Sequence, residues 1–299
     1  MKAATLESKF PILSVEHDCI ISKDADITVC YRVELPELFT VTQAEYEAIH
    51  SAWAKAVKVL PNYSIVHKQD FFIEESYTPE LQKEDLSFLS RSFERHFNER
   101  PYLHYLFLTK TTKEHSRTTS SFNALTRGFI IPKEMQDKEA VSRFLEYCEQ
   151  FERIINDSGF ITLTRLTGDE ITGTESTAGI IEKYFSLSQE DTTCLQDITL
   201  GAGKMKIGDN YLCLHTLSDP EDLPTSVATD SRYERLSTDR SDCRLSFAAP
   251  IGVLLTCNHI VNQYLFIDDS AEILRKFEQT ARNMHSLSRY SRSNQINRE

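Results

Sequence analysis

Apolar and polar residues alternate in several short segments of the chain, and this pattern predicts β-strands. Segments 17–22 and 26–35 lie on either side of the turn KDAD and are rich in β-branched residues, so they predict a β-hairpin. Three further strands are predicted at 64–75, 102–111 and 160–166. The strand pattern therefore accounts for much of the first half of the chain.

Other segments repeat their apolar residues with helical spacing. In segment 42–60, Thr42 is placed to cap the helix, Glu45 completes a capping box, and Pro61 ends the helix. Gly159 follows a second helical segment in the position of a left-handed C-terminal cap. That second segment is 138–157, and further helices are predicted at 83–100, 176–187 and 272–290.

The order of these elements predicts an α+β fold, in which antiparallel sheets carry helices packed on one face. Segments 23–40 and 206–225 resemble each other loosely, and each is followed by a strand and a charged helix. We therefore expect two ferredoxin-like (split βαβ) units. The first lobe covers residues 1–192, with a helical insertion at about 116–190. The second covers residues 193–299 and is incomplete, because it reaches Glu299 without a closing strand or a helix stop signal.

The composition is that of a soluble globular protein, with 299 residues, 40% hydrophobic and 26% charged. The formal net charge of −12 argues against general nucleic-acid binding, because phosphate repels an acidic protein. Seven cysteines without regular spacing favour a reducing compartment over a disulfide framework. The N-terminus has no secretory signal, and the longest apolar run, 247–257, is too short to cross a bilayer. We expect a cytoplasmic protein, at most peripheral to a membrane.

The stretch DITLGAGKMKIGDNYL, residues 197–212, contains the glycines and lysine of a possible phosphate-binding loop. A P-loop requires GxxxxGK followed by Ser or Thr. Here Ile198 stands where the first glycine belongs, and Met205 stands where a hydroxyl would bind magnesium. Lys206 likewise replaces the third glycine of a dinucleotide-binding motif. The flanking residues alternate as strands, so we interpret GAG and GDN as hairpin turns and expect no nucleotide or other cofactor here.

Cysteine and histidine stand two residues apart in three places. Alternate residues of a strand share one face, so two such pairs on neighbouring strands could bind zinc. Buried thiols beside histidines explain the spacing more simply, because no CxxC-type signature accompanies it. No GxSxG or HExxH motif supports a hydrolase, and the charged segment 233–244 is interpreted as solvated or as part of an interface. The three pairs are His17 and Cys19, Cys213 and His215, and Cys257 and His259.

Six long strings in the chain resemble one known family. They are FPILSVEHDCIISKDADITV, FLSRSFERHFNERPYL, IEKYFSLSQEDTTCLQDI, TDSRYERLSTDRSDCRLSFAAPIG, NQYLFID and ARNMHSLSRYSRSNQIN. They are similar to the N-terminal region of the TraG-type ATPase encoded by conjugative transposons. That ATPase is itself similar to the large traffic ATPase of type IV secretion systems. The resemblance covers essentially the whole chain and rests on long strings, not on a catalytic motif.

This resemblance implies a non-catalytic assembly and docking domain of an ATPase that powers DNA transfer. In the family, the P-loop, the acidic magnesium-binding strand and the motor lie downstream of this region. The fragment is therefore expected to have no enzymatic activity, with ATP and magnesium bound only beyond Glu299. The implied partners are inner-membrane secretion-channel subunits, the protein's own C-terminal motor domain and further copies of itself. The implied location is cytoplasmic and peripheral to the inner membrane.

The last predicted helix and the residues after it are rich in basic side chains. We expect them to contact the motor domain or acidic partners, and a merely solvated helix face is the alternative. No residue is assigned to catalysis, cofactor binding or metal binding. A nucleic-acid-binding module of the conjugation apparatus is the second hypothesis, although no aromatic residues interleave with a basic stripe. An independent hydrolase or zinc enzyme is the third. The candidate partner-contact residues are Arg275, Arg282, Arg289 and Arg292.

Overall fold

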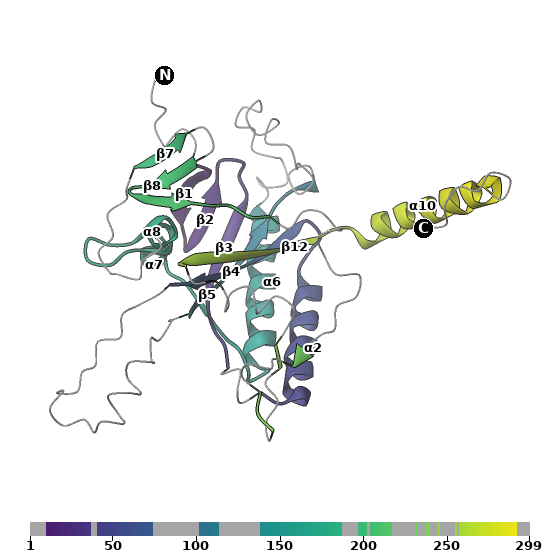
Figure 1. The fold of residues 1–299 in the computed structure, drawn as a ribbon, viewed down its shortest axis with the longest axis horizontal. Helices are drawn as coiled ribbons and strands as arrows, with labels where there is room; N and C mark the ends of the chain where they lie inside the picture. The colour runs from purple at the N-terminus through teal and green to yellow at the C-terminus, as the bar shows by residue number, and fades with distance from the viewer. Residues whose placement is uncertain are drawn as a thin grey trace.

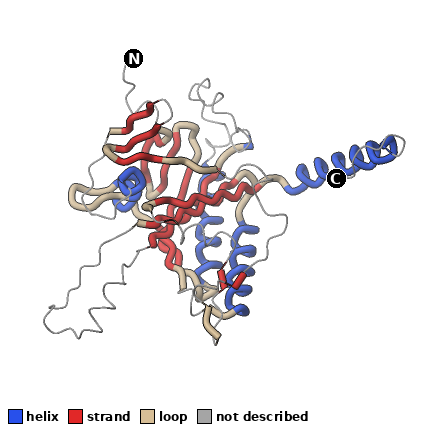
Figure 2. The backbone as a smooth tube through the Cα atoms, in the orientation of Figure 1, coloured by secondary structure: helices blue, strands red, loops and turns tan. Residues whose placement is uncertain are grey.

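The computed structural model of the chain contains a large antiparallel sheet, helices packed against it, and one long helix that projects from it (Figure 1). Figure 2 shows the same arrangement by element type, with the strands gathered at the centre. The structure describes residues 10–36, 41–73, 102–113, 138–186, 197–201, 204–216, 231–232, 237–239, 244–245, 255 and 257–291. The predicted helix at 83–100 and most of the charged segment 233–244 lie outside these residues.

The large sheet has seven strands among the described residues, in the order β1-β2-β3-β5-β4-β12, with β6 also paired to β3. All of its pairings are antiparallel. The strands β2 and β6 share one edge of β3, since β2 pairs with its first half and β6 with its second half. The strands are β1 (Ile12–Glu16), β2 (Cys19–Ser22), β3 (Ile27–Glu34), β4 (Ser64–Phe72), β5 (Tyr102–Lys110), β6 (Thr162–Arg165) and β12 (His259–Ile267).

The centre of this sheet is a split βαβ unit. The helix α2 (Gln43–Val59) connects β3 to β4, and β5 lies between these two strands and pairs with both. The predicted capping box begins α2: the Glu45 N–H donates to Thr42 Oγ1 at 3.3 Å, and Glu45 Oε2 accepts from the Thr42 N–H at 2.8 Å. These bonds satisfy backbone groups that the first helical turn leaves without partners.

Two buried clusters lie on the two faces of the sheet. The first joins Val29, Val66 and Leu106 of the sheet to α2 and to α6 (Lys138–Asn156), which contributes Phe144 and Phe151. Figure 1 shows α2 and α6 side by side along this face. The expected one-face packing therefore holds for the two long helices.

The second cluster covers part of the other face, which sequence reasoning left without helices. It joins Cys30, Phe71 and Phe107 to Ile171 and Ile180. The last two residues come from the short helices α7 (Gly168–Thr172) and α8 (Ile180–Ser186). The expectation of helices on one face only is corrected here, because these apolar side chains need the same shelter from water as the first cluster.

The remaining described elements are small hairpins and the long helix. The two elements β10 (Ser231–Arg232) and β11 (Arg244–Leu245) form a short pair, and α10 (Ser270–Ser291) follows β12. The strands β7 (Ile198–Gly201), β8 (Lys204–Ile207) and β9 (Asn210–Leu212) form a separate three-stranded sheet. The predicted GDN turn is confirmed, since it joins β8 to β9 with Gly208 at a φ of 57°, where glycine is favoured.

Several local predictions are confirmed. The segments around KDAD form the hairpin β2–β3, and Gly159 has a φ of 74° after α6. The α+β class with antiparallel sheets is also confirmed. The helix predicted from residue 176 instead begins at Ile180, because the Gly179 N–H donates to the Glu182 carboxylate at 3.0 Å and so marks the helix start.

The expected division into two lobes meets one contrary feature. The strand β12 comes from residues 193–299, yet it pairs with β4 of the first lobe along its whole length, from His259 opposite Phe72 to Ile267 opposite Ser64. A strand of the expected second lobe thus extends the sheet of the first. The boundary at residue 192 stays a prediction.

Candidate functional site

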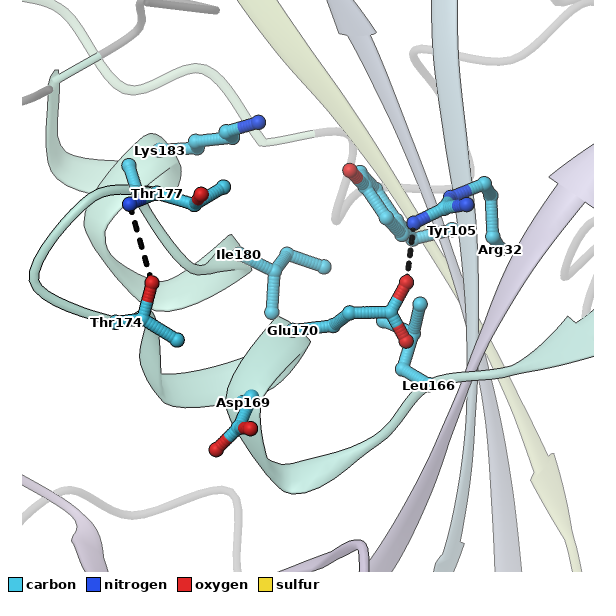
Figure 3. Close-up of a pocket in the computed structure, with 10 residues that line it drawn as sticks. Arg32, Tyr105, Leu166, Asp169, Glu170, Thr174, Thr177, Ile180 and Lys183 are labelled. Atoms are coloured by element: carbon cyan, nitrogen blue, oxygen red, sulfur yellow. Dashed lines mark hydrogen bonds and ion pairs between the residues drawn. The ribbon is translucent and has the colours of Figure 1, made fainter. Parts of the chain in front are cut away.

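One cavity of about 290 Å³ lies between the sheet and the short helices (Figure 3). Arg32 and Tyr105 line it from β3 and β5, while Glu170 and Lys183 line it from α7 and α8. Figure 3 shows Arg32 and Glu170 pointing toward each other across the cavity, with Tyr105 beside them. These residues include a cation, a carboxylate and a phenol, which are groups that can bind or act on a ligand.

The carboxylate of Glu170 has partners on both oxygens. Its Oε1 accepts from Arg32 Nη2 at 2.6 Å, and its Oε2 accepts from the Thr167 N–H at 2.9 Å. The backbone hydrogen bond from Thr167 lowers the pKa of Glu170, and the Arg32 charge lowers it further. The ionised Glu170 caps α7 and joins it to Arg32 of β3, so it holds the helix against the sheet. We therefore assign Glu170 and Arg32 a structural role.

A second, larger groove of about 450 Å³ lies on the other side of the sheet. The helix α2 forms one wall with Ile49 and Trp53. The edge strand β12 forms part of its rim with Gln263 and Leu265. Most of its lining is apolar, as in many sites that bind a small molecule or an apolar side chain of a partner.

A polar cluster on β4 and β5 lies beside this groove. Asp70 is buried, and its two oxygens accept from Lys68 Nζ and His104 Nδ1, each at 2.7 Å. Burial by itself would raise the pKa of Asp70, but the His104 hydrogen bond and the Lys68 charge outweigh it, so the pKa lies below its usual value. The cluster is an internally satisfied ionic network, which fixes the register of β4 against β5.

The helix α10 carries three large apolar side chains that are mostly exposed. Leu274, Phe277 and Met284 are 62%, 67% and 56% exposed. Their spacing, with Ile273 and Ala281, gives one apolar stripe along the helix. Figure 1 shows α10 projecting away from the sheet, so the described part of the fold leaves this stripe uncovered. Contiguous exposed apolar surface of this kind marks interaction sites.

The predicted basic contact residues belong to the same helix. Arg275 and Arg282 are exposed and seven residues apart, so they share one side of α10, roughly opposite Phe277. Arg282 makes an ion pair of 3.5 Å with Glu278 within the helix. Arg289 lies in α10 without a described side chain, and Arg292 lies outside the described residues. The structure thus brings two of the four predicted residues together on one face.

Sequence reasoning identified these arginines but missed the apolar stripe on the same helix. Apolar residues with helical spacing usually face a core, and nothing in the letters separates a buried stripe from an exposed one. The available signal was the coincidence of that stripe with an excess of basic residues in 270–291.

None of the three Cys/His pairs lies within a single strand, as the zinc alternative would require. His17 lies in the turn between β1 and β2 with a φ of 52°, and Cys213 and His215 follow the end of β9. His259 begins β12, and its Nδ1 lies 2.7 Å from the carbonyl oxygen of Cys257. The i, i+2 rule applies only inside a strand, so it places none of these pairs. Within the described ranges, no group of three or more His, Cys, Asp or Glu could hold a metal ion.

The interpretation of the cysteines as buried thiols is confirmed for three of the described ones and is wrong for Cys213 and Cys257, which are exposed. Cys19, Cys30 and Cys148 lie in the two cores, and burial raises the pKa of each thiol. A thiol held protonated is a poor nucleophile, so these residues behave as small apolar side chains.

Among the helices that the structure describes, none is both long and apolar enough to cross a membrane.

The comparison with protein families finds a match at the N-terminus. Residues 1–51 match a model described as "Domain of unknown function, B. Theta Gene description (DUF3875)". The matched residues include β1, the β2–β3 hairpin and the beginning of α2. No curated protein matches the chain. Residues 1–51 of this chain are therefore similar to a family of proteins whose function has no description.

Proposed function

We propose that this chain is a non-catalytic docking and assembly domain of a conjugation-type (type IV secretion) ATPase that powers DNA transfer. The observation that carries the proposal is the exposed apolar stripe of α10, with Phe277 at its centre. A helix that leaves such residues in water gains free energy when a partner covers them, at about 25 cal/mol per Å² of apolar surface. In this proposal, the role of α10 is to bind a partner through its apolar stripe.

The charge distribution supports an acidic partner. Residues 270–291 carry four basic and two acidic side chains, a net charge of +2, whereas the whole chain carries −12. Arg275 and Arg282 lie away from the apolar stripe, so one partner can cover the stripe while an acidic surface meets the arginines. In this proposal the partners are the downstream motor domain and subunits of the inner-membrane secretion channel.

The conjugation context rests on the resemblance of the long sequence strings to TraG-type ATPases. The family match at residues 1–51, with its B. Theta description, fits a conjugative element loosely. The resemblance and the family match both indicate which proteins this chain is related to. The exposed helix α10 indicates what this part of the chain can do. The location that goes with the proposal is the cytoplasmic side of the inner membrane.

The double substitution Phe277→Ser and Met284→Ser tests the docking role of α10. Both side chains are more than half exposed, so we expect the free energy of unfolding to change by less than about 0.5 kcal/mol. Loss of two central contacts should lower the frequency of DNA transfer by about tenfold or more, measured by mating with a donor that carries the mutated gene.

A matched control removes two equally exposed apolar side chains elsewhere. Leu13 and Tyr211 are 63% and 61% exposed, and Leu13→Ser with Tyr211→Ser should leave transfer unchanged. Equal transfer by the α10 double variant and the native protein, at equal protein levels, would contradict the docking proposal.

Titration of the purified chain with MgATP tests the non-catalytic part. Lys204 begins β8 of a three-stranded hairpin sheet, and Met205 follows it where a P-loop has a hydroxyl. We expect no heat of binding in a calorimeter. Micromolar affinity or steady phosphate release would refute the assignment, and a GxxxxGK[ST] motif encoded downstream of Glu299 would support it.

A further inference from the structure

The strand β12 is an edge strand whose outer side is open. Its nine residues pair with β4 on one side, and no strand among the described residues pairs with it on the other. An edge of this kind presents a row of backbone N–H and C=O groups that can pair with another chain. Figure 1 shows β12 along the near edge of the sheet, leading directly into α10.

The two edges of the sheet differ in protection. At the opposite edge, β1 has five residues, a register irregularity between Ile12 and Ser14, and Glu16 at its end. Short length, bulges and charges are the usual devices that prevent edges from pairing. In contrast, β12 reads HIVNQYLFI and contains no proline and no charged residue. Its Tyr264, Leu265 and Phe266 are 57%, 43% and 56% exposed.

The strand is nevertheless held firmly to its own sheet. The Tyr264 ring stacks on His67 with centroids 4.2 Å apart, and His67 stacks on Phe107 at 5.0 Å. Asn262 Oδ1 accepts from Gln69 Nε2 at 2.9 Å and lies 2.8 Å from His67 Nε2. Side chains of β4 thus anchor β12, and Phe107 of β5 supports His67 from behind, so the outer edge of β12 is a preformed template for pairing.

The sequence of β12 is also complementary to itself. If two copies run antiparallel with Gln263 opposite Gln263, all nine residues find partners. Ile260 then lies opposite Phe266, and Val261 lies opposite Leu265. Aromatic and β-branched residues facing each other are favourable cross-strand pairs. No like charges face each other in this register, although each chain carries −12 in total.

We propose that two copies of this chain associate through β12, in antiparallel register centred on Gln263, to form one continuous sheet. The contact is isologous, since the same strand serves both copies, and such twofold contacts are the commonest in soluble oligomers. It goes beyond the proposed docking role, because it uses the sheet edge and leaves the stripe of α10 on each copy for other partners. The two α10 helices leave the shared strand pair at opposite ends.

Introducing a charged side chain at position 263 tests the proposed register of the two strands. Gln263 is exposed, and the twofold axis places its side chain beside its own copy. In Gln263→Glu, two carboxylates oppose each other, and in Gln263→Lys, two ammonium groups do so. Each variant should self-associate about fivefold more weakly than the native chain in sedimentation of the full 299-residue protein. An equal mixture of the two variants should restore association to the native level or above.

Thr164 provides the matched control, because it is an exposed strand residue of β6, away from β12. Thr164→Glu and Thr164→Lys should leave self-association unchanged. A native chain that stays monomeric at its highest soluble concentration would overturn the proposal. The proposal would also be overturned if both Gln263 variants self-associate as strongly as the native chain and mixing them does not strengthen the association. Either result leaves the docking role of α10 untouched, since DNA transfer tests that role separately.

Discussion

Phe151→Ala is expected to lower the free energy of unfolding by about 3–5 kcal/mol, the usual cost of removing a buried aromatic ring. Phe151 is fully buried in α6 and meets Trp53 of α2 edge to face, with ring centroids 5.8 Å apart. It therefore joins the two long helices to each other over the sheet. Its removal leaves a cavity that the surrounding helices fill only in part. Urea unfolding of the purified chain measures the loss.

Tyr147→Ala is the control in the same helix. Tyr147 is 37% exposed, so truncation removes fewer buried contacts and should cost less than about 1 kcal/mol. A loss of similar size for both variants would mean that α6 is not packed as described. It would also weaken the assignment of the first core to the α2 and α6 face.

Asp70→Asn is expected to lower the free energy of unfolding at neutral pH by about 1–3 kcal/mol, because it removes a charged acceptor from a buried network. Asp70 accepts hydrogen bonds of 2.7 Å from both Lys68 and His104. The loss is expected in the lower part of the range for buried pairs, because the side chain of Lys68 is 35% exposed and water can reach its ammonium group.

The effect of Asp70→Asn should depend on pH with a definite sign. Burial disfavours the charged carboxylate, but His104 and Lys68 favour it more strongly, so its pKa is lower in the folded chain. A lowered folded pKa gives stability that is present above the unfolded pKa and is lost as the pH falls through the folded pKa. The gap between the native chain and the variant should therefore narrow in acid, as followed by urea unfolding at several pH values.

Asp24 supplies the control for this experiment. It is exposed in the turn between β2 and β3, and Asp24→Asn should change stability little at any pH. A gap between the native chain and Asp70→Asn that widens as the pH falls would contradict the ionised state of Asp70 in the folded protein.

The amino-acid sequence alone predicted the elements that are determined by contacts between residues close together in the chain. The β2–β3 hairpin follows from alternation around KDAD, and the start of α2 follows from the spacing of Thr42 and Glu45. Gly159 likewise marks the end of α6 through its backbone freedom. In each case the deciding contacts join residues a few positions apart, so the order of residues contains the information.

The candidate site was predicted only in part, because only part of it depends on residues that are close together in the sequence. The basic residues of α10 are visible in the sequence, and the structure places Arg275 and Arg282 on one face of a described helix. The exposure of Phe277 could not be predicted, because it depends on what the rest of the chain leaves uncovered. The interpretation of the Cys/His pairs as buried thiols holds for Cys19 and is wrong for Cys213 and Cys257, which are exposed, because burial depends on what the rest of the fold covers.

The sequence by itself determined the α+β class, many strand and helix positions, and the helix caps at Thr42 and Gly159, because periodicity and capping act within a few residues. Only the tertiary structure decided that β12 extends the sheet beside β4, that α7 and α8 cover its second face, and that α10 stands away from it. Strand partners and exposed faces depend on contacts between residues far apart in the chain. Many registers and packings satisfy the same local pattern, and the burial of the whole chain selects among them.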